Sequence, residues 1–519
     1  MFEKKRVGKA LFLMALWCAI VCGTGASAWA DEKSIVVGLA SDALYLDPQQ
    51  QDETITNALT RHLYDGLLNT NSDGNAVAAL AESWDLTDDQ LTWTFHLRKG
   101  VKFADGTPFT AEDVKFTVER ARTTIINDIV STIKDVEVVD DHTVKITTLA
   151  PDGVLLDNLA QLRIMSKAYT TRVGDDEVNL KPIGTGPYVC TEWIKEDHID
   201  LVPNEHYWGE APAIKNVRFR PITNAATRTA ALLSGEVDVI EDVPVRDVER
   251  VGKNGGIEVV TRPGERLIYL HIDANREPTP AVDLPVNPMK DLRVRQAISM
   301  GINRDVIVKV TMNGNGYPTG QLVLEGRRGY VSGRPLPEYN PEKAKELLKE
   351  AGYENGFKVV LDAPNGRYIN DAQVAQALAS QLSKIGVQVE LNLHPKSVFF
   401  DYVRPGDKSS LVMTGWSEPI DTGSMANTLF YTRGKNPAKG GSNRCHYSNA
   451  DFDKLIDDAD ATADIGLRKE LLEKASLVIL DDVGVIPLYF DQDLYGKKAN
   501  VKFSPRADKY ILVSEMDVE

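Results

Sequence analysis

The sequence predicts an α/β protein with more than one domain, and its length and its alternation of helical and strand segments support this prediction. The chain has 519 residues, of which 43% are hydrophobic, so it can bury more than one core. Segments with helical periodicity alternate with segments of strand periodicity through its second half. Proline and glycine are scattered, and no long low-complexity linker marks a boundary between domains. Alternation of this kind indicates substantial sheets covered by helices.

The first thirty residues have the three parts of a secretory signal peptide. Four basic residues precede an apolar run from Ala10 to Cys22, and 28–30 form an Ala-Trp-Ala cleavage site. The run is about thirteen residues long, which is too short to span a bilayer. We expect cleavage after Ala30 and a periplasmic protein. Cys22 leaves a lipid-anchored form as the second choice, because Val21 stands where lipid-attachment signals carry a small residue.

The remaining chain is strongly acidic. The whole sequence has 59 basic and 75 acidic residues, and the signal segment holds four of the basic ones and Glu3, which leaves a net charge of −19. Such a surface repels nucleic acid and anionic membranes, so we expect neither as a partner. Only Cys190 and Cys445 remain, too few for a disulfide scaffold, and we expect two buried free thiols.

The stretch 80–120 predicts a strand, a tight turn and a capped helix. Apolar side chains alternate with polar ones in 92–98, which is typical of a strand with one buried face. The sequence Asp-Gly-Thr-Pro at 105–108 predicts the turn. Thr110 and Asp113 have the spacing of a capping box, so a helix should begin after Thr110.

The second half of the chain repeats a helix followed by a strand. Asn340 and Pro341 predict a helix start, with a cap residue followed by proline at the first helical position. A second helix is expected at 371–385, where apolar residues recur at helical spacing and Gly386 ends the pattern. Alternating apolar residues at 387–393 then predict a strand.

Several of these segments resemble the family 5 extracellular solute-binding proteins. The strongest is AESW at 81–84 followed by TWTFHLRKGVKFADGTPFTAEDVKFT at 92–117. The YDGL sequence at 64–67 and GTGPY at 184–188 extend the resemblance over most of the chain. This family includes the dipeptide, oligopeptide, glutathione and nickel receptors of ABC importers.

The resemblance implies the periplasmic-binding-protein type II fold, in which two α/β lobes are joined by a two-stranded hinge and lobe 1 carries an extra subdomain. Lobe 1 is expected at 31–269, with the subdomain inserted at about 51–184. Lobe 2 is expected at 270–486, and 487–519 should return to lobe 1. The chain would then cross between the lobes near 268–275 and again near 485–491.

The resemblance also implies that the loop after the predicted strand 411–415 lines the ligand cleft. Trp416 matches the family's tryptophan, and an aspartate three residues later binds the peptide's α-amino group in the resembled receptors. Pro419 stands at that position here. Glu418 or Asp421 could replace the lost carboxylate, and the sequence leaves both open.

Two further loops supply the remaining candidates for ligand binding. Arg367 follows a Pro-Asn-Gly turn, and its planar guanidinium could bind a ligand carboxylate. Ser41 and Asp42 follow the predicted first strand at 34–40, and the resemblance implies that this loop faces the cleft.

The sequence contains no motif for catalysis or for a cofactor. The GxSxG, HExxH, CxxC and Walker motifs are all missing. His198 and His206 are eight residues apart across a turn, and we expect solvated or core histidines rather than metal ligands. We therefore expect no enzyme, no catalytic residue, no cofactor and no metal site.

These observations predict the periplasmic substrate-binding component of an ABC importer. The cargo would be a short peptide or peptide-like solute, such as a dipeptide, an oligopeptide or a glutathione-like molecule. The partner would be the permease's transmembrane subunits, and the protein would act as a monomer. One alternative keeps the receptor but gives it a chelated metal such as nickel, or a sugar, as cargo. A second alternative is a secreted hydrolase.

Overall fold

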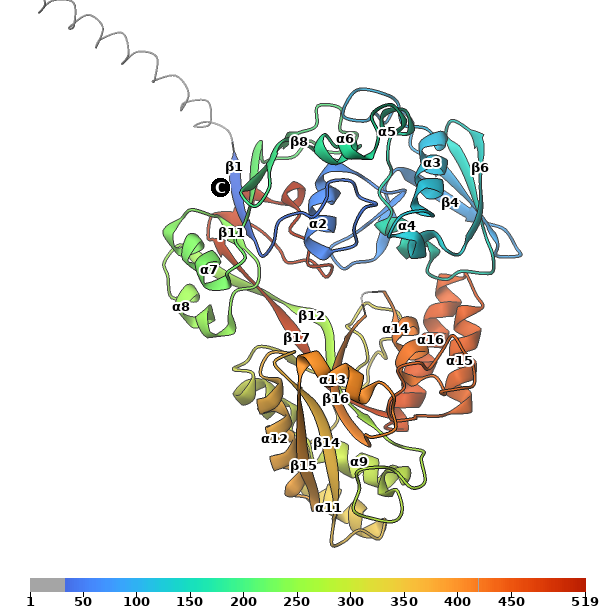
Figure 1. Ribbon diagram of the computed structural model, residues 1–519, viewed down its shortest axis with the longest axis vertical. Coiled ribbons are helices and arrows are strands. Elements are labelled where there is room, and N and C mark those ends of the chain that lie inside the picture. The colour runs from blue at the N-terminus through green and yellow to red at the C-terminus, as the bar shows by residue number, and fades with distance from the viewer. Residues whose placement is uncertain (1–32, 419) are drawn as a thin grey trace, which may run out of the picture.

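The computed structural model describes residues 33–418 and 420–519. Two lobes are connected by a pair of long strands, β12 (Ile257–Ile272) and β17 (Val485–Lys498) (Figure 1). The expected signal peptide, its cleavage site and Cys22 lie outside the described residues. Within the described part of the chain, no helix is long and apolar enough to cross a membrane.

One mixed sheet runs through both lobes. Its strands lie in the order β15-β14-β16-β12-β17-β11-β1-β10-β9-β8, and β13 pairs with β17. The lobe 2 strands are β13 (Tyr317–Pro318), β14 (Phe357–Asn365), β15 (Val387–Pro395) and β16 (Leu411–Ser417). The lobe 1 strands are β1 (Ser34–Leu39), β8 (Tyr188–Ile194), β9 (His198–Pro203), β10 (Asn216–Pro221) and β11 (Val239–Ile240).

The predicted strand-turn-helix segment forms part of a subdomain beside this sheet. Its antiparallel sheet has the order β4 (Ala81–Leu86), β5 (Thr92–Leu97), β7 (Thr143–Thr148) and β6 (Ile133–Asp140). Trp93, Phe95 and Leu97 of β5 enter its core together with residues of α3 (Ala111–Ala121). The Thr110 backbone N–H donates to the Asp113 carboxylate at 2.9 Å, which confirms the predicted helix start.

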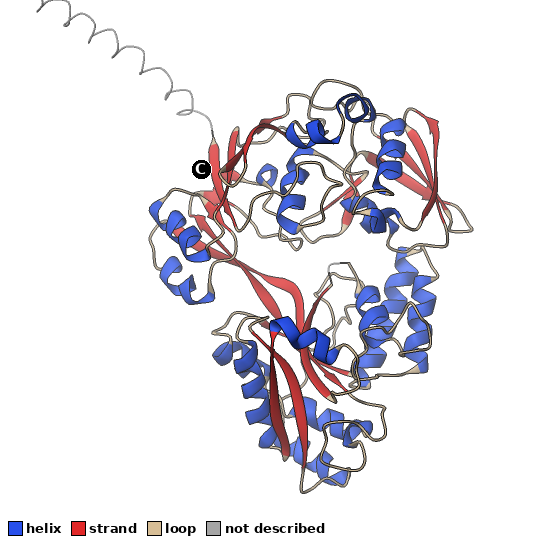
Figure 2. Cartoon of the chain, in the orientation of Figure 1, coloured by secondary structure: helices blue, strands red, loops and turns tan. Residues whose placement is uncertain are grey.

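Helices cover both faces of the lobe 2 strands (Figure 2). The helix predicted after Asn340 is α11 (Pro341–Glu350), and the Asn340 side chain accepts from the Lys343 N–H at 3.0 Å. The second predicted helix is α12 (Asp371–Ser383), and β15 follows it as expected. Other helices of this lobe are α9 (Leu292–Met300), α10 (Arg304–Val306), α13 (Lys396–Val403), α14 (Thr422–Met425), α15 (Ala450–Asp460) and α16 (Ile465–Asp481).

Shorter elements complete lobe 1. Its helices are α2 (Thr54–Leu63), α4 (Leu155–Gln161), α5 (Lys167–Val173), α6 (Asp175–Leu180), α7 (Ala225–Ser234) and α8 (Val248–Gly252). Its short strands are β2 (Leu68–Thr70), β3 (Ala76–Ala78), β18 (Val501–Lys502) and β19 (Asp517–Val518). Cys190 and Cys445 are both free; Cys445 is buried as expected, whereas Cys190 is only partly buried.

The connecting strands carry a break in register between the lobes. β12 and β17 pair from Ile257 opposite Lys498 to His271 opposite Val485, with a register shift between Pro263 and Leu267. A shift of this kind bends the strand and turns side chains out of the ladder. The predicted crossings near 268–275 and 485–491 fall at or beside these strands, and the lobe boundaries of the sequence analysis stay predictions.

Candidate functional site

A cavity of about 490 Å³ lies between the lobes. Lobe 1 contributes the start of α2, the end of α4 and the segment 507–510, and lobe 2 contributes Arg327, Ser417 and Ile420. The irregular part of β12 adds Glu265 and Arg266. This volume falls in the range of small-molecule sites, roughly 300–1,000 Å³.

Charged side chains of both signs line the cavity in equal number. The acids are Asp52, Asp157, Glu265 and Asp508, and the cations are Arg163, Arg266, Arg327 and Lys509. Most of them are already in ion pairs. Glu265 pairs with Arg327 inside the cavity wall. Four other cavity residues pair with residues outside the cavity lining. These pairs are Asp157 with Arg328 at 2.5 Å, Asp508 with Arg506 at 2.6 Å, Arg266 with Asp491 at 3.4 Å and Lys509 with Asp493 at 2.5 Å.

Asp52 and Arg163 make no ion pair within the described residues. Asp52 is exposed and accepts one hydrogen bond, from the Asn57 side chain at 3.0 Å. Arg163 is only 5% exposed, and its guanidinium donates to the Ala160 carbonyl at 2.8 Å. Burial lowers the pKa of Arg163, as expected for a cation that lacks a carboxylate partner. The cavity therefore offers one carboxylate and one guanidinium to a ligand.

Residues next to Trp416 line the cavity, whereas Trp416 itself does not. Trp416 lies at the end of β16, partly buried against the core beside α15 and α16, and its indole N–H donates to Glu418 at 3.2 Å. Ser417 and Ile420 line the cavity, and Pro419 lies outside the described residues. Glu418 is 5% exposed, and burial raises its pKa to about 8, so its carboxyl is mostly protonated at neutral pH.

Asp421, the second candidate for binding a ligand ammonium, pairs with two arginines of the protein. It is buried and accepts from Arg468 at 2.9 Å and from Arg328 at 3.2 Å. Burial alone would raise the pKa of Asp421, but the two guanidinium groups hold it below its ordinary value. A buried carboxylate is stable only when it is paired, and the arginines meet that need before any ligand arrives.

Arg328 also joins the two lobes. Its guanidinium contacts Asp421 on its own lobe and Asp157 of α4 on the other, and we name these three residues the interlobe triad. Nearby, the Gln90 side chain accepts from the Ala463 N–H at 2.7 Å. These contacts lie on the side of the molecule away from β12 and β17 (Figure 1).

The other predicted residues lie outside the cavity lining. Arg367 is exposed, with its guanidinium 4.7 Å from the Phe400 ring. Asp42 accepts from the Trp193 indole at 3.3 Å and from the Glu196 N–H at 2.7 Å, and Ser41 precedes it in the same loop. Ligand contact by Arg367, Ser41 and Asp42 therefore stays a prediction, and none of the three lines this cavity.

The two lobe 2 loops that the sequence indicates are nevertheless brought together. The Gly415 N–H donates to the Tyr368 hydroxyl at 2.9 Å, which ties the Arg367 loop to the end of β16. Asp52 and Arg163 are not identifiable from the sequence, because neither belongs to a motif or a periodic pattern. Only their meeting in space makes them candidates.

Comparisons with known proteins agree with this architecture. The model for "Bacterial extracellular solute-binding proteins, family 5 Middle" matches residues 75–437. The glutathione-binding protein GsiB of Salmonella typhimurium is 30% identical over 481 residues, which cover 90% of this chain and 91% of the relative.

Two of the solved structures with the same fold are a peptide-binding relative and an unliganded one. The murein tripeptide binding protein MppA in its unliganded open form superposes with a TM-score of 0.83 at 24% identity, over 94% of this chain and 98% of that one. DppA from Helicobacter pylori in complex with the peptide STSA gives a TM-score of 0.65 at 27% identity, over 94% and 99%. The type II fold expected from the sequence is confirmed. The chain belongs to family 5 of the bacterial extracellular solute-binding proteins.

Proposed function

We propose that this protein is the substrate-binding component of an ABC importer and that its cargo is a short peptide or a peptide-like solute. The interlobe cavity holds the cargo, and a membrane permease receives it. The observation that carries the proposal is that Asp52 and Arg163 line the cavity and make no ion pair with any described residue. The names of GsiB and of the DppA–peptide complex support the same class of cargo.

The charges match a zwitterion. A free peptide brings an ammonium and a carboxylate, and each would lose several kcal/mol if it left water without a partner. Asp52 can accept from the ammonium, and Arg163 can donate two parallel hydrogen bonds to the carboxylate. The remaining cavity charges are already in ion pairs, so a solute with no net charge leaves no charge unpaired.

The lobes close over the bound solute. The structure superposes better on the unliganded open form of MppA than on the DppA–peptide complex, with TM-scores of 0.83 and 0.65, which supports an open state for this structure. Closure would exclude water from the cavity and strengthen both charge contacts. The protein works outside the cytoplasm as a monomer and returns its cargo unchanged, which separates it from a secreted hydrolase.

The first experiment identifies the cargo. Mass spectrometry of whatever solute is released by mild denaturation should detect a peptide or a peptide-like molecule. Incubation of that solute with refolded protein should leave it intact, since a receptor has no reason to cleave it. Release of a sugar or a metal chelate would favour the alternative cargo. Cleavage products would favour the alternative that the protein is a secreted hydrolase.

The second experiment tests the recognition of charge. Asp52→Asn and Arg163→Gln should each weaken binding of the free peptide by about tenfold or more, because a hydrogen bond to a charged group contributes roughly 1.5–3 kcal/mol. Acetylation of the peptide's N-terminus should reproduce the first loss and amidation of its C-terminus the second. Arg367→Ala is the matched comparison, since its guanidinium lies on Phe400 outside the cavity lining. Calorimetry in which blocked and free peptides bind equally well would contradict the proposal.

A further inference from the structure

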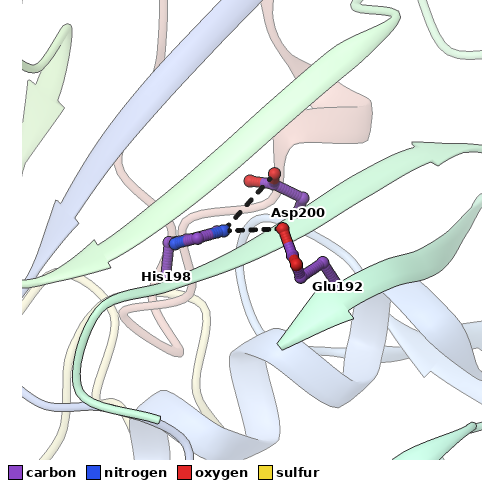
Figure 3. Close-up of side chains that lie close together, drawn as sticks. All are labelled: Glu192, His198 and Asp200. Atoms are coloured by element: carbon purple, nitrogen blue, oxygen red, sulfur yellow. Dashed lines mark hydrogen bonds and ion pairs between the residues drawn. The ribbon is translucent and has the colours of Figure 1, made fainter. Parts of the chain in front are cut away.

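A second group of ligand-type side chains lies on lobe 1, away from the interlobe cavity. Glu192 of β8 stands opposite Asp200 of β9 in the hairpin register, and His198 precedes Asp200 by two residues on the same strand face. Figure 3 shows the His198 ring directed at both carboxylates. None of the three belongs to the lining of the interlobe cavity.

The distances suit one metal ion. His198 Nε2 lies 3.1 Å from the Glu192 carboxylate and 3.6 Å from the Asp200 carboxylate. All three ligand atoms lie within 4.8 Å of one another. Ligand atoms around tetrahedral zinc are separated by about 3.4 Å, given bonds of 2.0–2.2 Å. The ion could enter with little movement of the side chains.

The surrounding residues hold the ligands in the orientation that a metal needs. Asp197 lies 2.6 Å from His198 Nδ1 and accepts its proton, which leaves Nε2 directed at the two carboxylates. Arg218 of β10 binds both oxygens of Asp200, at 2.7 and 2.5 Å, and so fixes that carboxylate. The His198 side chain is only 10% exposed, whereas the Glu192 side chain is 54% exposed and leaves a path for the ion.

The charge of the group also matches a divalent ion. The three carboxylates of Glu192, Asp197 and Asp200 and the guanidinium of Arg218 leave two negative charges around a neutral imidazole. Imidazole nitrogen and carboxylate oxygen are both zinc ligands, and the imidazole favours zinc over magnesium and calcium, which prefer oxygen ligands alone.

We propose that Glu192, His198 and Asp200 bind a zinc ion at the β8–β9 hairpin, with Asp197 as the outer partner of the histidine and water completing the coordination. The site is independent of the cargo in the interlobe cavity. The zinc proposal is therefore tested separately from the proposed function.

The test titrates zinc chloride into the mature chain by calorimetry, after removal of any histidine tag and of bound metal with a chelator. One zinc ion should bind per chain. His198→Gln should abolish that binding, and Asp197→Asn should weaken it by about tenfold to 100-fold, as loss of an outer partner does. Cobalt substitution gives a second readout, because the intensity of its visible absorption depends on the coordination number of the bound ion, and His198→Gln should change that absorption.

The matched control is His96→Gln. His96 lies 2.8 Å from Asp85 on the subdomain sheet and is a histidine–carboxylate pair outside the proposed site. Its substitution should leave zinc binding unchanged, and thermal unfolding should show that each variant is folded. The proposal is overturned if the wild-type chain shows no saturable zinc binding. It is equally overturned if His198→Gln binds zinc as well as His96→Gln does, since the ion would then bind elsewhere on the acidic surface.

Discussion

The buried carboxyl of Glu418 should make the stability of this protein fall as pH rises. Its side chain is enclosed beside the cavity, and burial raises its pKa from 4.5 to about 8. An unfolded chain releases this proton near pH 4.5, whereas the folded chain keeps it until about pH 8. Between these values the unfolded state binds fewer protons, so the free energy of unfolding decreases as pH increases.

The magnitude follows from the two pKa values. The slope approaches about 1.4 kcal/mol per pH unit, and the accumulated loss is on the order of 5 kcal/mol above pH 8. Other buried carboxyls add to the slope of the wild type, including Glu241, whose pKa burial raises to about 7. The difference between the wild type and Glu418→Gln isolates one group, because the amide keeps the size of the side chain and does not titrate.

The assay is urea unfolding of both proteins at several pH values from 5 to about 8.5, across the interval between the two pKa values. The stability of Glu418→Gln relative to the wild type should increase steadily with pH. Glu325→Gln is the control, since Glu325 is exposed and makes no ion pair within the described residues. A constant difference between Glu418→Gln and the wild type would refute the reasoning and show that Glu418 is ionised in the folded protein.

Three further predictions concern the relation between the lobes. Arg328→Met should lower the free energy of unfolding by about 2–4 kcal/mol, because Asp157 is left buried without its partner. A loss below about 0.5 kcal/mol in urea unfolding would show that water solvates the interlobe triad. Gly264→Ala should lower the melting temperature by several degrees, because the added Cβ would lie 2.1 Å from the Asp491 carboxylate, next to the register shift in β12. Calorimetric scans of the variant equal to those of the wild type would contradict this close approach. Peptide at a hundredfold excess over Kd should stabilise the protein by about 2.7 kcal/mol and reduce its radius of gyration, and an unchanged radius in small-angle scattering would exclude closure.

Several features of the fold were predictable from the sequence because they depend on neighbours in the chain. The strand at 92–98 follows from alternation, and the helix after Thr110 follows from a hydroxyl and a carboxylate three residues apart. The helix after Asn340 follows in the same way from its cap. Together with the resemblance of 80–120, these local signals were enough for the architecture and the family.

Which charged side chains meet in the interlobe cavity was decided only by the tertiary structure. The sequence leaves Glu418 and Asp421 open as the ligand carboxylate, and only the fold shows that Arg328 and Arg468 pair with Asp421. Asp52 and Arg163 carry no local signal, yet they are the charged residues of the cavity lining that make no ion pair with the described chain. The role of an ionisable side chain depends on its burial and on the charges within a few ångströms of it, and both are set by residues distant in the sequence.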